Sequence, residues 1–310
     1  VNACHVLQAA GVRPIILSMG RGRADGSRRV FGWAVRRAGR VPIVYSPFIH
    51  IRLFSKVLSV LGPTLFILKR RRQRQTVLVL YNRLAFGILP LVVARLIGWA
   101  VVVDLEDGEI LPSPAASGSL RSSTKTLSKK LLIGLYDQLC NRAILAATTL
   151  NKFTSLRPTW PYYGSVRTVP YKPRPKDGRI KVLYSGTVIP ETGSTTLIAA
   201  LDILAREFPV SARSLVVHVT GTGDGLIELQ QFAESQPKPR LIIHGRLDSA
   251  KYNSLLQKAD VGLSLKEVGG DLADTTFPSK TVEYAAAGLY VISTDISDVR
   301  GVLGDSARFV

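Results

Sequence analysis

The carboxy-terminal half of the chain alternates short apolar segments with helical ones, and this order constrains the fold more than any other feature. The apolar segments have the length of strands and are bounded by turn-forming residues. We predict strands at residues 180–184, 215–220, 241–244, 261–265 and 290–293. We predict helices between them at residues 195–206, 225–235, 249–258 and 278–287. Strict alternation of this kind indicates a parallel, doubly wound sheet, which binds ligands at the carboxyl ends of its strands.

The amino-terminal half shows the same alternation less regularly. Apolar runs predict strands at residues 14–18, 43–46, 77–80 and 101–104. We predict a helix that ends before Gly11 and another at residues 131–147, while residues 111–128, rich in Ser, Ala, Gly and Pro, indicate a loop. We therefore expect a second Rossmann-like domain with a parallel sheet.

Two longer apolar stretches, residues 41–68 and 84–103, have the length of a membrane span. Charged residues and prolines interrupt both of them. In the second stretch, Pro90 and Arg95 favour a helix that ends near residue 97, followed by a buried strand. Neither stretch is predicted to cross a membrane.

Residues 170–178 contain three prolines and four charges and are the best candidate for a linker. The charge balance changes beside them: residues 1–172 hold 26 Lys+Arg and 6 Asp+Glu, a net charge of +20, whereas residues 173–310 hold 15 and 16, a net charge of −1. We predict one domain on each side of this boundary. The residues just before Val310 also predict a strand. Because the chain starts at Val1 and stops at Val310, directly after this strand, we expect the first domain to be incomplete at its start and the second at its end.

The segment around residues 275–288 carries the chemistry that is easiest to interpret. A helix that begins at Pro278 has free backbone N–H groups for an anion. The helix dipole disfavours a cation in the first turn, so Lys280 makes sense there if a phosphate is bound. Glu283 could accept two hydrogen bonds from the diol of a ribose. The alternative is an exposed Lys–Glu pair on a solvated face.

This segment resembles the donor-site signature of the retaining GT-B glycosyltransferases of family 4. The resemblance rests on Phe277-Pro-Ser-Lys-x-x-Glu-Tyr-x-Ala-x-Gly288 and on the strand that follows it. Four earlier segments fall in the family's order: Tyr184-Ser-Gly-Thr, Thr220-Gly-Thr-Gly, His244-Gly-Arg-Leu and Ala259-Asp-Val-Gly-Leu-Ser. The match is good over residues 180–310 and loose before them. It implies a GT-B fold, in which two Rossmann-like domains face a cleft, and retaining glycosyl transfer from an NDP-sugar without a metal or another cofactor.

The resemblance also implies roles for single residues. Glu283 would bind the ribose hydroxyls, and Gly186 with Thr187 would let the backbone approach the diphosphate. Arg246 and Leu247 would lie beside the nucleobase.

The chain departs from the family at three positions. The family's second glutamate falls on Thr275, and two cations of its diphosphate clamp fall on Thr187 and Thr192. Lys280 is the expected substitute for these cations, and Arg246 is the second choice.

Two loops complete the candidate site. The backbone N–H groups of Gly269 and Gly270 could orient sugar hydroxyls or phosphate oxygens, although a plain surface loop is an equal alternative. In the other half, an acidic run that includes Asp104 and Asp107 follows a predicted strand and could orient the acceptor hydroxyl. N-caps and ion pairs are the alternative for this run. We take Lys280, Glu283 and Asp107 as candidate catalytic residues.

Residues 69–74 hold five cations directly after the apolar residues 54–68. An apolar stretch that ends in a cation cluster suits an anionic membrane surface. A nucleic-acid partner is not expected, because few aromatic residues alternate with the charges. Two cysteines, Cys4 and Cys140, make no disulfide framework and suggest a reducing compartment.

We therefore predict a cytoplasmic glycosyltransferase on the inner face of the cytoplasmic membrane. Its partners would be an NDP-sugar, a glycan or lipid-linked glycan acceptor, and the anionic membrane surface, and its product would enter a surface polysaccharide. The alternatives are an epimerase of the same fold, a non-catalytic sugar-nucleotide-binding subunit, and a nucleic-acid binder.

Overall fold

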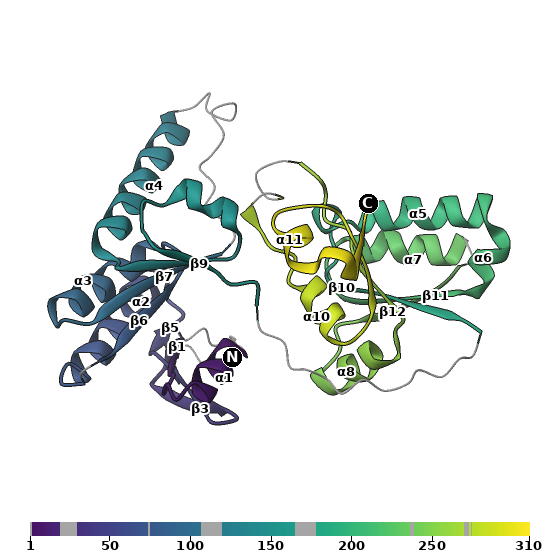
Figure 1. The fold of residues 1–310 in the computed structure, drawn as a ribbon. Helices are drawn as coiled ribbons and strands as arrows, with labels where there is room; N and C mark the ends of the chain where they lie inside the picture. The colour runs from purple at the N-terminus through teal and green to yellow at the C-terminus, as the bar shows by residue number, and fades with distance from the viewer. Residues whose placement is uncertain are drawn as a thin grey trace. The chain divides into compact units, whose positions relative to one another are not determined.

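The computed structural model describes residues 2–18, 30–73, 75–106, 120–164, 178–235, 239–269, 273 and 275–310. The chain forms two compact units, Val1–Ser165 and Val166–Val310 (Figure 1). The predicted domain boundary between residues 172 and 173 lies outside the described ranges.

The carboxy-terminal unit is built on one sheet in which all described strands are parallel. The strands, in their order across the sheet, are β12 (Arg240–Gly245), β11 (Leu215–Thr222), β10 (Ile180–Thr187), β13 (Val261–Ser264), β14 (Tyr290–Ser293) and β15 (Ala307–Phe309). In chain order this is 3-2-1-4-5-6, the order of doubly wound nucleotide-binding sheets. The direction of winding reverses between β10 and β13, where such sheets bind their ligands.

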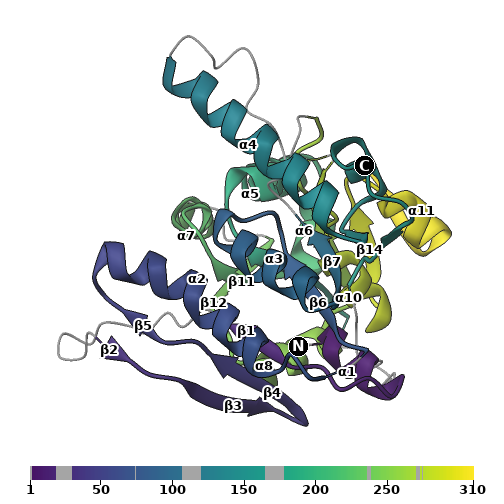
Figure 2. The ribbon, with the colours of Figure 1, turned by 90° about the vertical axis from the view of Figure 1, so that its left-hand side faces the viewer.

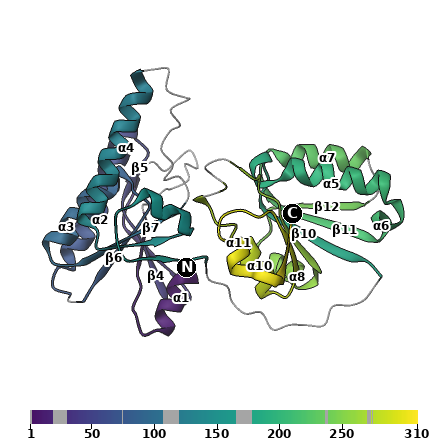
Figure 3. The same ribbon diagram turned by 45° about the horizontal axis from the view of Figure 1, so that its top comes forward.

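Helices cover both faces of this sheet because each buried strand is apolar on both sides. The main ones are α5 (Ser194–Glu207), α7 (Gly225–Ser235), α8 (Ser249–Lys258) and α10 (Lys280–Ala286). On β10, Val182 and Tyr184 join the core under α5 and α7, whereas Leu183 joins the core under α8 and α10. Figure 3 shows α5 and α7 on one side of the strands and α8 on the other.

The structure confirms every predicted strand and helix of this half to within a few residues at each end. It adds the short helices α6 (Pro209–Ser214) and α11 (Val299–Leu303), and it confirms the strand predicted just before Val310 as the edge strand β15.

The amino-terminal unit is less regular than predicted. A parallel sheet consists of β6 (Val77–Tyr81), β7 (Ala100–Leu105), β8 (Arg142–Leu145) and β9 (Thr159–Pro161). A second sheet consists of β1 (Ile16–Ser18), β4 (Val41–Tyr45) and β3 (Ala34–Ala38), and a third pairs β2 (Val30–Phe31) with β5 (Phe48–Ile49).

The expectation of wholly parallel strands in this half was wrong for β3 and for the β2–β5 pair, which are antiparallel. Two residues, Gly39 and Arg40, separate β3 from β4, and Gly39 has a φ of 61°. Only antiparallel strands can be joined by so short a turn.

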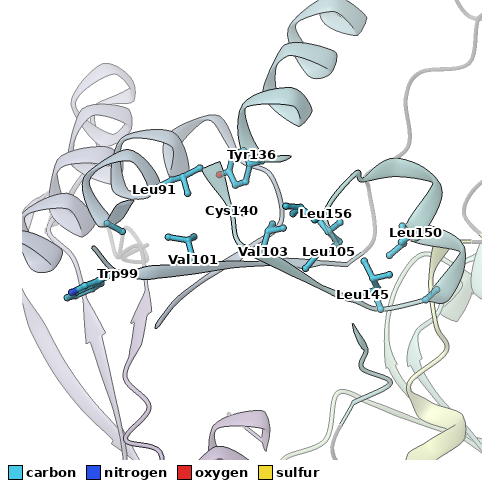
Figure 4. Packing of buried hydrophobic residues seen from close by; sticks show 14 of the residues in the cluster. Leu91, Trp99, Val101, Val103, Leu105, Tyr136, Cys140, Leu145, Leu150 and Leu156 are labelled. Atoms are coloured by element: carbon cyan, nitrogen blue, oxygen red, sulfur yellow. The ribbon is translucent and has the colours of Figure 1, made fainter. Parts of the chain in front are cut away.

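Three helices, α2 (Arg52–Lys69), α3 (Ile88–Leu96) and α4 (Leu120–Leu139), share one core with the parallel sheet (Figure 4). Val101, Val103 and Leu105 of β7 point into this core and are fully buried. The prediction of a helix followed by a buried strand over residues 84–103 is confirmed. Among the described residues, no helix has both the length and the apolar character needed to span a bilayer.

The predicted helix at residues 131–147 was wrong at its end, and the predicted loop at 111–128 was wrong from residue 120 onward. Helix α4 begins at Leu120 and ends at Leu139, and strand β8 follows. Asn141 lies between the end of α4 and the start of β8, and its Oδ1 accepts a hydrogen bond of 2.8 Å from Val101 N on β7. Pairing with β7 draws the apolar residues after Asn141 into the sheet, which local periodicity cannot reveal.

A buried ion pair fixes α4 to the rest of this unit. Arg83 Nη2 lies 2.6 Å from Asp137 Oδ1, and their side chains are 1% and 9% exposed. Arg83 also donates to Phe153 O, and Asp137 accepts from Thr154 and Ser155. The pair therefore joins the end of β6, helix α4 and the loop before β9.

Candidate functional site

The carboxyl end of β10 lies where the winding of the carboxy-terminal sheet reverses, and its backbone has open space beside it. Gly186 has a φ of 132°, and a Cβ placed on it would meet no atom within 4 Å. A Cβ on its neighbour Gly221 would lie 1.7 Å from Gly186 O. Gly221 is thus required by the close approach of two strands, while Gly186 leaves its backbone accessible to a ligand.

A network of charged and hydroxyl groups lies beside this strand end. Lys280 Nζ donates to Glu283 Oε2 at 2.5 Å. Tyr252 OH of α8 donates to the same carboxylate oxygen at 3.1 Å and accepts from Lys280 at 3.2 Å. Two candidate residues from one helix therefore meet a tyrosine from another.

Ser185 connects this network to β10. Its Oγ lies 3.1 Å from Tyr252 OH and 2.8 Å from Tyr284 OH, and its backbone N–H donates to Tyr284 OH at 3.0 Å. The residue next to Gly186 is thereby held against α8 and α10. One hydrogen-bond network thus connects Glu283, at the predicted ribose position, with the residue next to Gly186, at the predicted diphosphate position.

The electrostatics of the site leave both phenols neutral. Burial raises the pKa of Tyr252, and Glu283 beside it raises that pKa further. Burial also raises the pKa of the fully buried Tyr284. The side chains of Lys280 and Glu283 are 36% and 30% exposed, so a ligand can reach both.

Helix α10 begins at Lys280, two residues later than predicted. The backbone N–H of Thr281 is bonded to Pro278 O at 2.9 Å, and that of Glu283 is directed to Ser279 O at 3.4 Å. The Lys280 ammonium lies 4.6 Å from the centre of the Tyr252 ring. Its role as a phosphate ligand stays a prediction.

Thr192, which replaces a clamp cation of the family, closes the loop after β10. Its Oγ1 donates to Thr187 O at 2.6 Å and accepts from Ile189 N at 3.2 Å, and its carbonyl accepts from Tyr184 OH at 2.9 Å. The hydroxyl therefore holds the loop in shape, a role that a lysine could not fill.

The structure reveals a cation that sequence reasoning missed. Lys266 follows β13 at the point where the winding reverses, and its Nζ donates to Thr276 Oγ1 at 2.8 Å. Thr275, which stands at the family's second glutamate, is 3% exposed beside it. Lys266 directly follows the strand predicted at residues 261–265, and this position could have identified it as a candidate. Tyr252, Ser185 and Tyr284 had no such signal, because only folding brings them together.

Arg246 and Leu247 lie on the turn that connects β12 to α8. Arg246 is exposed and, within the described part of the chain, takes part in no hydrogen bond or ion pair. A bulge precedes this turn, because Val219 pairs with Ile243 whereas Thr220 pairs with Gly245.

The side chain of the bulge residue, His244, lies on the same side of the sheet as His218. His244 Nε2 is 2.9 Å from His218 Nδ1. Burial, then the imidazole of His244 and the cations Lys181 and Arg240, lower the pKa of His218 to about 4. His218 is therefore neutral at physiological pH, and its contact with His244 supports the turn that leads to Arg246.

Two candidate residues, Gly270 and Asp107, lie outside the described ranges. Gly269 is exposed and has a φ of 95°. In the amino-terminal unit, Asp104 lies at the carboxyl end of β7, and its buried Oδ1 has no hydrogen-bond partner among the described residues. Burial raises the pKa of this carboxyl group to about 6.

Comparison with known proteins gives a family match for the carboxy-terminal unit. Residues 179–310 match the model of the family described as glycosyl transferases group 1. A comparison with curated protein sequences found no match.

Solved structures resemble the whole chain. A trehalose-6-phosphate synthase, OtsA, has a TM-score of 0.68 at 11% identity, with 100% of this chain and 82% of that chain covered. An Escherichia coli structure described as bound with UDP-2-fluoro glucose has a TM-score of 0.64 at 12% identity, with coverage of 100% and 83%. A Burkholderia xenovorans UDP-forming trehalose-phosphate synthase in complex with glucose-6-phosphate has a TM-score of 0.66 at 11% identity, with coverage of 96% and 81%. These similarities confirm the predicted fold.

Proposed function

We propose that this chain, a GT-B glycosyltransferase whose carboxy-terminal unit belongs to the glycosyl transferases group 1, moves a sugar from a nucleoside-diphosphate sugar to a saccharide with retention. The observation that carries the proposal is the contact of Lys280, Glu283 and Tyr252 beside the accessible backbone of Gly186. A ribosyl diphosphate requires a carboxylate for its ribose hydroxyls and an ammonium for its phosphates. It also requires an accessible strand end where the winding of the sheet reverses.

In the donor complex, Glu283 accepts hydrogen bonds from the ribose hydroxyls and Lys280 turns to the diphosphate. Each group then exchanges its present partner for one on the ligand. Lys266 supplies a second cation at the same edge of the sheet. UDP is the nucleotide we favour, because a similar structure is described with a UDP-sugar.

The reaction breaks the bond between the anomeric carbon and the diphosphate oxygen. The acceptor hydroxyl attacks that carbon from the face that the diphosphate leaves, and its proton passes to the leaving phosphate oxygen. The products are a glycoside of retained configuration and an NDP. The cations Lys280 and Lys266 stabilise the negative charge that develops on the diphosphate.

We place the acceptor hydroxyl near Asp104 and Asp107. The support is the buried Oδ1 of Asp104 at a strand end, which has no partner among the residues that the structure describes and to which a sugar hydroxyl can donate. A saccharide acceptor agrees with the glucose-6-phosphate in a similar structure, and we favour a lipid-linked saccharide used for surface polysaccharide. The excess of cations before residue 173 supports a position on the inner face of the cytoplasmic membrane.

A thermal-shift panel of UDP-, GDP- and dTDP-sugars tests donor recognition. We expect one nucleotide to raise the unfolding temperature of the wild type and of Glu228→Ala, a matched exposed glutamate on α7, but not of Glu283→Ala. A donor-specific shift that survives Glu283→Ala would refute the assigned site.

Release of NDP in the presence of membranes separates transfer from other outcomes. Donor conversion without any acceptor would indicate an epimerase. Donor binding without NDP release would favour a non-catalytic subunit, the alternative suggested by Thr187 and Thr192 in place of clamp cations.

A further inference from the structure

The helices α2, α3 and α4 form one layer on the parallel sheet of the amino-terminal unit. Helix α3 packs against α2 on one side and α4 on the other, and Figure 2 shows the three side by side. Their inner sides share one core, to which Ile67, Leu91 and Tyr136 contribute. Their outer sides carry exposed side chains among the described residues.

Large aliphatic side chains remain exposed on each of the three helices. Spacings of three, four or seven residues keep them on one side of each helix. They are Val57, Leu61, Leu65 and Leu68 on α2, Leu89 and Leu96 on α3, and Leu127, Leu131 and Leu135 on α4. Their exposed fractions range from 36% for Leu68 to 80% for Leu96. An apolar surface spread over three neighbouring helices indicates a binding face.

The charges around these side chains have one sign. Helices α2 and α3 contain no acidic residue, and the single acid of α4, Asp137, is buried against Arg83. Exposed cations accompany the aliphatic side chains: Lys69, Arg71, Arg72, Arg95 and Lys130. A second copy of this face would be repelled, whereas an anionic surface would be attracted.

Aromatic rings lie at the edge of the layer. Trp33, 44% exposed, stacks on Phe66 of α2 with ring centres 6.3 Å apart, and the Arg70 guanidinium lies 3.7 Å above the Phe66 ring. Amphipathic rings and cationic side chains of this kind are typical of the boundary between lipid headgroups and acyl chains.

We propose that the outer sides of α2, α3 and α4 form a single face that binds an anionic lipid bilayer. This three-helix face extends the proposed membrane location, on which it rests, from the cation run after α2 to two further helices. The leucines enter the headgroup boundary and the cations contact lipid phosphates. Single-stranded nucleic acid fits less well, since bases stack on aromatic rings and the exposed apolar side chains of the three helices are aliphatic.

Sedimentation with lipid vesicles tests the proposal. We expect the wild type to bind phosphatidylcholine vesicles that contain phosphatidylglycerol, to bind pure phosphatidylcholine weakly, and to lose binding as salt increases. The variants are Leu61→Gln/Leu65→Gln on α2 and Leu131→Gln/Leu135→Gln on α4. Each should weaken binding about tenfold or more, because each removes two inserted side chains.

The matched control is Ile203→Gln/Ile227→Gln, two exposed isoleucines of the carboxy-terminal unit, which should bind vesicles as the wild type does. Circular dichroism and the unfolding temperature verify that every variant folds. Unchanged binding by the α4 variant would overturn the three-helix face, as would wild-type preference for RNA over anionic vesicles. The donor-induced thermal shift, measured without lipid, reports separately on the proposed function.

Discussion

Lys280 Nζ and Glu283 Oε2 are 2.5 Å apart on the first turn of α10, so the two groups assigned to donor binding neutralise each other. Both side chains are about one-third exposed, and an ion pair so placed contributes little to folding, about 0–1 kcal/mol. A diphosphate and a ribose can therefore replace the pair at low cost. The contact keeps both side chains oriented for a ligand without making the site rigid.

Replacing Glu283 by Gln should weaken donor binding and leave stability nearly unchanged. A hydrogen bond to a charged group contributes about 1.5–3 kcal/mol, so we expect the dissociation constant to rise about tenfold to a hundredfold. Titration calorimetry with the preferred NDP-sugar measures the change. Lys280→Met should give a similar loss. If the losses in donor affinity were additive in the Glu283→Gln/Lys280→Met double variant, the two side chains would not exchange their mutual contact for the ligand.

Tyr252→Phe removes the hydroxyl that connects Glu283 to Ser185 and keeps the ring beneath Lys280. The carboxylate would lose one of its two orienting contacts, at a cost of about 1 kcal/mol and thus about fivefold in donor affinity. Fluorescence or calorimetric titration tests this. Tyr290→Phe, at an exposed tyrosine of β14, is the control. Equal affinities for both variants would show that Tyr252 does not position the carboxylate.

Asp137→Ala should destabilise the amino-terminal unit by about 3–5 kcal/mol, because it leaves the buried guanidinium of Arg83 without its counter-charge. The surface pair of Asp202 and Arg206 offers a matched comparison, and Asp202→Ala should cost less than about 1 kcal/mol. Urea unfolding measures both. Similar losses of unfolding free energy in the two variants would mean that the contribution of the Arg83–Asp137 pair to stability does not depend on its burial.

Asp104→Asn should stabilise the chain above about pH 6. Burial raises the pKa of Asp104 from 3.8 to about 6, so ionisation costs more in the folded chain than in the unfolded one. This unfavourable contribution develops between pH 3.8 and 6 and is absent below that window. Since the group is partly solvated, we expect a gain of about 1 kcal/mol at neutral pH. Unfolding curves across this pH range, together with a transfer assay in which Asp104→Asn is slower, test both of its roles.

Acidification should destabilise the turn that carries Arg246. The pKa of His218 is lowered from 6.5 to about 4, so the unfolded chain binds the proton first as the pH falls. The stability contributed by neutral His218 is complete above pH 6.5 and is lost progressively toward pH 4. In unfolding experiments, His218→Asn should reduce the slope of the unfolding free energy against pH between pH 6.5 and pH 4. A slope equal to that of the wild type would exclude the His218–His244 pair as its source.

The parts of the fold that the sequence predicts are those with local signals. The strands of the carboxy-terminal sheet are short apolar runs between turn residues, and Lys280 and Glu283 share one helical turn. Prediction from the sequence failed where contacts between residues far apart in the chain determine the structure. Strand β8 was taken for helix because its partner, β7, is distant in sequence. Tyr252 and Ser185 stayed unrecognised because 67 positions separate them and only the sheet brings them together.

The packing of Gly221 against Gly186 limits how this protein can change its donor. Any side chain at position 221 would displace the Gly186 carbonyl, 1.7 Å from its Cβ, and with it the strand end where we place the diphosphate. A substitution at position 221 is therefore expected to disturb the proposed diphosphate site through the backbone of Gly186. New donor specificity is instead accessible through positions such as Arg246, whose side chain is exposed and held by no described neighbour. If the diphosphate binds where we propose, the backbone at Gly186 tolerates little change, whereas the side chain at position 246 can be replaced without loss of a described contact.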